Sequence, residues 1–130
     1  MIKRNLILCV SFALLVFAQQ GLASPAAGAS DSVRTMATIL KFLNHFPDDD
    51  GKAKLNKIIG SSDALAAEKT VASAILNLQH SASSSDKKKL SKVMSDNSAS
   101  QAVRDLANIV HNLNHKPSSS DKAILKKYSW

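Results

Sequence analysis

The chain has 130 residues, with 17 Lys plus Arg against 10 Asp plus Glu, and it contains a single cysteine. One cysteine excludes a disulfide-stapled miniprotein, and the length is enough for one domain with a modest core. The formal net charge of +7 favours acidic partners, but it does not choose among lipid headgroups, polysaccharide, nucleic acid and acidic protein.

Residues 1–23 have the order of a secretory signal. A basic start at Lys3 and Arg4 precedes an apolar run from Leu6 to Ala18. That run is too short to be read as a membrane-spanning helix. We therefore expect an export signal, with an uncleaved anchor as the other interpretation.

The signal ends in small residues that suit a signal peptidase. Gly21 and Ala23 predict cleavage after Ala23, and Ala27 or Ala29 are alternative ends. Cleavage would remove Cys9 and both basic residues of the signal, which leaves about 107 residues with a net charge near +5. We expect the mature protein to be secreted or periplasmic, without a thiol.

The sequence repeats itself with a period of 35 residues. Residues 31–60, moved by 70 positions, match 101–130 without a gap at twelve of thirty positions. Residues 66–95 match the same segment at half that offset, again with twelve identities. A fixed period of this length predicts tandem structural units.

The repeat divides the chain into a linker and a helical repeat domain. We expect a flexible linker at 24–31 and a domain at 32–130. The domain would hold three units, at about 31–62, 63–97 and 98–130.

Apolar residues within each unit follow helical spacing and predict two helices joined by a polar loop. The fold class expected is therefore all-α, with six helices in three tandem helix-loop-helix repeats, as a short α-solenoid or a compact helical bundle. The first helix of each unit would bury one stripe: Met36, Ala37, Leu40 and Leu43; Val71, Ala72, Ile75 and Leu78; Leu106, Ala107, Val110 and Leu113. The shorter second helix would bury Leu55, Ile58 and Ile59; Leu90, Val93 and Met94; Leu125 and Tyr128.

Turn and capping residues predict where these helices begin and end. Pro47 and Pro117 are expected to end first helices. Asp86 and Asp121, or the serine before each, are expected to cap second helices, with Asp50 in that role in the first unit.

Histidine recurs at the C-terminal end of every first helix, as His45, His80 and His115. Repeated imidazoles could bind a metal or sense pH, but stacked repeats would hold equivalent residues about 10 Å apart, too far for one ion. We interpret the three as donors to free helix carbonyls. His111 and His115 could form a surface pair, but the sequence offers no third ligand nearby, so no metal and no cofactor is predicted.

The acidic run Asp48–Asp50 before Gly51 has the residue types of a calcium loop. Its counterparts in the other units are serine-rich, at 83–86 and 118–121, and the later glutamate of a calcium loop is missing. We interpret the run as a capping loop.

Lysine is frequent in every second helix. Parallel stacking would gather these lysines into a basic face for a polyanion or an anionic membrane; the alternative is a solvated face that keeps the protein soluble. Because arginine is scarce and aromatic residues are few, specific recognition of nucleic acid is not expected. The lysines are Lys52, Lys54, Lys57, Lys87, Lys88, Lys89, Lys92, Lys122, Lys126 and Lys127.

Aromatic residues interrupt the repeat at its two ends. Phe42 and Phe46 differ from their counterparts, so they would cover the open end of the first unit or form an exposed protein contact. Tyr128 and Trp130 could close the last unit, since terminal repeats need altered faces.

No carboxylate pair, nucleophile elbow, phosphate-binding glycine loop or metal-ligand cluster is visible in the sequence, so an enzyme is not expected. We expect an exported, small, non-catalytic helical repeat protein that binds a partner protein through its repeat surface. The alternative is binding of a polyanion or an anionic membrane surface through the lysine-rich second helices.

Overall fold

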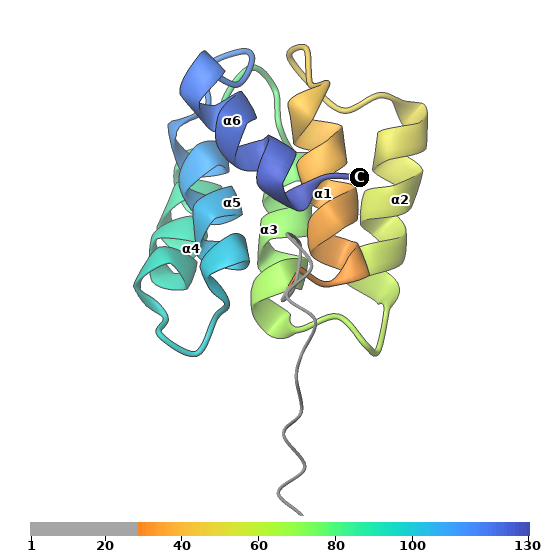
Figure 1. The fold of residues 1–130 in the computed structure, drawn as a ribbon, viewed down its shortest axis with the longest axis vertical. Coiled ribbons are helices and arrows are strands. Elements are labelled where there is room, and N and C mark those ends of the chain that lie inside the picture. The colour runs from red at the N-terminus through yellow and green to blue at the C-terminus, as the bar shows by residue number, and fades with distance from the viewer. Residues whose placement is uncertain (1–28) are drawn as a thin grey trace, which may run out of the picture.

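The computed structural model describes residues 29–130, so the expected signal at 1–23 lies outside the described residues. The described part is all-helical, which confirms the fold class. None of its helices is long and apolar enough to span a membrane. The helices in Figure 1 are α1 (Asp31–Lys41), α2 (Asp49–Gly60), α3 (Ala66–Leu76), α4 (Ser84–Ser95), α5 (Gln101–Asn112) and α6 (Ser119–Tyr128).

The helix bounds follow the period of the sequence. Helix α3 begins and ends 35 residues after α1, and α4 does the same relative to α2. Helices α5 and α6 begin at the same offset from α3 and α4. Helix α1 starts at Asp31, one residue before the expected domain boundary, because the Ser30 hydroxyl caps it by accepting a bond from the amide of Val33.

The expected caps of the second helices are wrong by two or three residues. The observed caps are Asp48, Ser83 and Ser118, each of which accepts a hydrogen bond from the amide three residues later. Asp121 is the third residue of α6, and its carboxylate accepts a bond from the amide of Ser118. Ser118 and Asp121 thus form a reciprocal capping box, in which Ser118 and not Asp121 is the N-cap of α6.

The prolines do not end the first helices. Helices α1 and α5 already end at Lys41 and Asn112, several residues before Pro47 and Pro117. The histidine in each following loop has a positive φ, so neither helix could continue through it to reach the proline. Each proline is instead buried directly before the cap of the following helix.

The six helices close into a ring. The three first helices, α1, α3 and α5, contact one another pairwise at the centre. Each second helix packs most extensively on the first helix of the next unit: α2 on α3, α4 on α5, and α6 back on α1. The α6–α1 contact, seen in Figure 1, makes the molecule a compact bundle and excludes the open solenoid.

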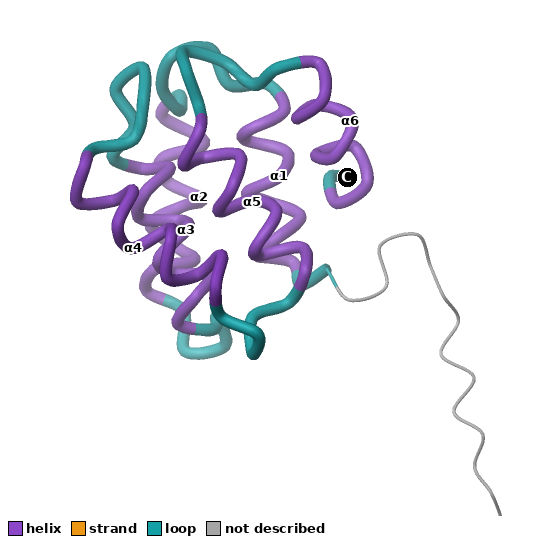
Figure 2. Tube along the Cα trace, turned by 90° about the vertical axis from the view of Figure 1, so that its left-hand side faces the viewer, coloured by secondary structure: helices purple, strands orange, loops and turns teal. Residues whose placement is uncertain are grey.

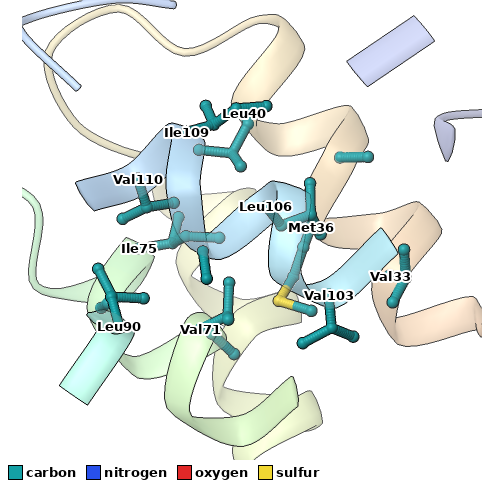
Figure 3. Close-up of a cluster of buried hydrophobic side chains, with 14 of the residues drawn as sticks. Val33, Met36, Leu40, Val71, Ile75, Leu90, Val103, Leu106, Ile109 and Val110 are labelled. Atoms are coloured by element: carbon teal, nitrogen blue, oxygen red, sulfur yellow. The ribbon is translucent and has the colours of Figure 1, made fainter. Parts of the chain in front are cut away.

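The core lies between the first helices and is covered by buried residues of the second helices, which are Leu55 and Ile58, Leu90 and Val93, and Leu125. Figure 3 shows side chains of α1, α3 and α5 converging there. Every residue predicted for the first-helix stripes is buried. Leu55, Leu90 and Leu125 have no exposed surface, whereas Ile59, Met94 and Tyr128 are only partly buried. Burial of each large aliphatic side chain contributes about 1.5–3 kcal/mol to folding.

The C-terminal aromatics take part in closing the ring. The hydroxyl of Tyr128 donates to Asp105 of α5 at 2.7 Å. The amide of Trp130 donates to the hydroxyl of Thr38 at 3.4 Å, and the Arg34 guanidinium lies 4.8 Å from the Trp130 ring centroid. These contacts join the end of α6 to α5 and α1.

Candidate functional site

The three loops that join first to second helices meet at one end of the bundle. This end is uppermost in Figures 1 and 2. In each loop the histidine amide donates to the carbonyl oxygen of another loop's histidine, and the three bonds form a closed triangle. The distances are 2.8 Å from His45 to His115, 3.2 Å from His80 to His45, and 2.6 Å from His115 to His80.

All three histidines have left-handed backbone conformations. Their φ angles are 75°, 68° and 65° for His45, His80 and His115, and no other non-glycine residue that the structure describes has a positive φ. Such a conformation is uncommon for a residue with a Cβ, although histidine tolerates it better than most. The triangle of hydrogen bonds holds the strained backbone in place.

The imidazole rings of the three histidines are also in mutual contact. Ring centroids are 5.1 Å apart for His45 and His80, 5.3 Å for His45 and His115, and 4.9 Å for His80 and His115. One nitrogen from each ring lies within 4.8 Å of the others. His45 is half-buried, and the other two side chains are exposed.

This arrangement contradicts the expected 10 Å separation. That distance assumed units stacked in a row, whereas the closed ring turns equivalent loops toward a common axis. The interpretation of the histidines as donors to helix carbonyls is also wrong, because their rings contact one another and no helix carbonyl within residues 29–130 accepts from them. His111 lies on α5, where its Nδ1 is 3.3 Å from Oδ1 of Asn112.

One ring of the histidine cluster, that of His115, has a polar partner that fixes its orientation. Nδ1 of His115 lies 2.6 Å from Oδ1 of Asn114. A carboxamide oxygen accepts from Nδ1–H, so this contact selects the tautomer in which Nε2 has a free lone pair.

Two exposed phenylalanines lie beside the histidine cluster, on the first of the three loops. Phe42 is 75% exposed and Phe46 is 55% exposed. Phe46 contributes to a hollow of about 610 Å³ that His80 and Lys52 also line. Both phenylalanines line a second hollow of about 360 Å³, together with Pro47. The loop end is therefore the part of the described chain where exposed aromatic surface and surface hollows coincide.

The lysine-rich second helices do not pack side by side within residues 29–130. Helices α2, α4 and α6 make no contact with one another within residues 29–130, because each lies on a different side of the ring. The parallel stacking from which a shared basic face was predicted is therefore not observed. Lys88, Lys89 and Lys92 are exposed on α4, and the two ion pairs in this part of the chain involve only Lys52 and Lys54 of α2.

The acidic run caps and pairs within its own helix. Asp48 accepts from the amide of Gly51 at 2.7 Å. Asp50 lies 2.7 Å from Nζ of Lys54, and its hydrogen bond and negative charge raise the pKa of that lysine. The carboxylates thus act locally, as the capping interpretation predicts.

Comparison with family models, with curated proteins and with solved structures finds no match to this chain.

Sequence reasoning found the three histidines but missed their convergence. A signal was present: a carboxamide precedes histidine in every copy, as Asn44, Gln79 and Asn114, while the residue after it varies. Retention of a two-residue element inside a variable loop indicates a shared constraint on that element.

Proposed function

We propose that this protein is an exported, small, non-catalytic helical protein that binds a partner protein through its loop end. The observation that carries the proposal is the exposure of Phe42 and Phe46 beside two hollows. Burial of each ring against a partner would contribute about 1.5–3 kcal/mol, and aromatic side chains that fill pockets are frequent binding hot spots.

The repeat itself supports this placement. The second copy has Asn77 and Ser81 where the first has Phe42 and Phe46, although the two loops have equivalent bounds and their histidine amides make equivalent hydrogen bonds. The loop fold therefore does not require the phenylalanines. A partner contact gives a reason for keeping two large apolar side chains in water.

The same comparison provides the test. A double variant, Phe42→Asn with Phe46→Ser, carries the residues of the second copy and should fold normally. Leu65→Ala is the matched control, because Leu65 is 64% exposed and lies in the segment between α2 and α3, at the opposite end of the bundle.

Benzophenone-phenylalanine at position 46 or 65 would be irradiated in the producing culture, and cross-linked species identified by mass spectrometry. The proposal predicts a discrete adduct from position 46 only, and capture of that partner by wild type and Leu65→Ala but not by the double variant. Equal cross-linking from both positions, or none from 46, would overturn it.

The export part of the proposal rests on the pattern of residues 1–23. N-terminal sequencing of protein recovered from outside the producing cell, or from its periplasm, should begin at Ser24. Recovery only from the cytosol, with Met1 retained, would refute export.

A second candidate function is binding of a polyanion or an anionic membrane through α4. Its support is the exposure of Lys88, Lys89 and Lys92 without an ion pair in the described chain. Binding to heparin or to anionic vesicles should weaken steeply with salt and with Lys88→Ala plus Lys89→Ala. Substitution of Lys126 and Lys127 on α6 is the control, and salt-independent binding would exclude this candidate.

A further inference from the structure

The imidazole cluster has the composition and spacing of a metal site. Three histidine nitrogens are a common ligand set for zinc, which binds each at about 2.0–2.1 Å and keeps a fourth, open position. Rings arranged around a tetrahedral ion in this way have centroids about 5 Å apart. The observed separations of 4.9, 5.1 and 5.3 Å fit that arrangement.

We propose that His45, His80 and His115 together bind one divalent transition-metal ion, with zinc as the best fit, on the central axis of the bundle. The ligand nitrogens now lie within 4.8 Å of one another, and about 3.4 Å is needed for tetrahedral zinc. Rotation of the rings about their side-chain bonds closes that difference. The backbone triangle stays in place.

The backbone explains the loop geometry but not the choice of side chain. Each bond of the triangle uses only the amide and carbonyl groups, which every residue except proline supplies. At a positive φ glycine has no steric penalty, and asparagine is the usual second choice. Histidine is nevertheless present at all three positions, so the imidazole has a role beyond closing the loops.

The cluster is also prepared chemically for a cation. The bond between His115 and Asn114 holds a proton on Nδ1 and leaves Nε2 as the ligand atom, which is the usual way proteins orient metal-binding imidazoles. The exposure of His80 and His115 gives an ion access from solvent. The fourth position would then hold water or a ligand from solution.

The proposal is independent of partner binding and leads to a direct test. The purified, untagged chain is titrated with ZnCl₂ by calorimetry. One zinc per chain is expected. Loss of any one of the three ligands, as in His80→Gly, should weaken binding at least about 10-fold, since even the loss of an orienting partner has that effect.

His111→Ala is the matched control, because it removes the one other histidine and leaves the cluster intact. Glycine is chosen for the cluster variants because it suits the positive φ, and circular dichroism checks their fold. As a second measurement on the unmodified chain, zinc should shift the ring resonances of His45, His80 and His115 and leave those of His111 in place. Absence of binding, binding unaffected by His80→Gly, or shifts confined to His111 would overturn the proposal.

Discussion

The amide of His45 donates to the carbonyl oxygen of His115 at 2.8 Å, and this bond joins two loops that are 70 residues apart in the chain. It is possible because α1 and α5, the first helices of the first and last units, contact each other directly in the closed ring. The histidine cluster therefore depends on closure of the helix ring, so measurements on the cluster also test whether the ring is closed.

Substitutions of His80 should separate backbone strain from side-chain function. His80→Gly relieves the left-handed strain but makes the unfolded chain more flexible, so the free energy of unfolding should stay within about 1 kcal/mol of wild type. His80→Val puts a β-branched residue at the same positive φ and should lower it by a further ~1–3 kcal/mol. Urea denaturation measures both. A glycine variant less stable than the valine variant would show that the backbone is not strained there.

Leucine-to-alanine substitutions in the second helices test whether the bundle is closed. Leu55, Leu90 and Leu125 are all fully buried. Each change to alanine should therefore lower the free energy of unfolding by about 2–5 kcal/mol, in one cooperative transition. In an open array the last helix would be weakly coupled. Hydrogen exchange measures the protection of each amide. If Leu125→Ala lost protection only in α6, with the rest of the chain unchanged, the result would contradict a closed bundle.

Much of this fold could be predicted from the sequence. Residues such as Leu40, Ile75 and Val110 are buried because their helical spacing puts them on one face of a helix, and that spacing is local information. The packing of α6 on α1 could not be predicted, because nothing local in either helix specifies it. The 10 Å separation expected for the histidines was wrong for the same reason, because their close approach depends on how helices of different units pack.

The hydroxyl of Ser30 is predicted to contribute more than an ordinary helix cap. It accepts a bond from Val33 and donates to the buried carboxylate of Glu68 at 2.6 Å. Ser30→Ala should therefore lower the free energy of unfolding by about 2–3 kcal/mol, because a buried charge loses a partner. Ser100→Ala is the control: Ser100 caps α5 by accepting from the amide of Val103, as Ser30 does from Val33, but within residues 29–130 no carboxylate accepts from its hydroxyl. Its loss should be about 1 kcal/mol. Equal losses in thermal or urea unfolding would show that the Glu68 contact adds nothing.

Tyr128 should make stability depend on alkaline pH. Burial, the hydrogen bond to Asp105 and the charge of that carboxylate raise the pKa of Tyr128 from 10.0 to about 12. Because the folded-state pKa lies above the unfolded value, the stabilisation is fully present below pH 10 and is lost as pH rises toward 12.

Tyr128→Phe should lower the free energy of unfolding by about 1 kcal/mol at neutral pH, a value reduced because Tyr128 is partly exposed. The variant should also lack this part of the pH dependence of stability. Unfolding measured in urea between pH 8 and 12 checks both effects. Parallel curves for wild type and variant would exclude the contact as the cause.

The most direct test of the metal proposal is a crystal of the chain grown with zinc and measured at the zinc absorption edge. The structure predicts one anomalous peak between the rings of His45, His80 and His115, with each ligand nitrogen about 2.0–2.1 Å away. Zinc bound only at His111 or at carboxylates, with the three rings unoccupied, would contradict the account.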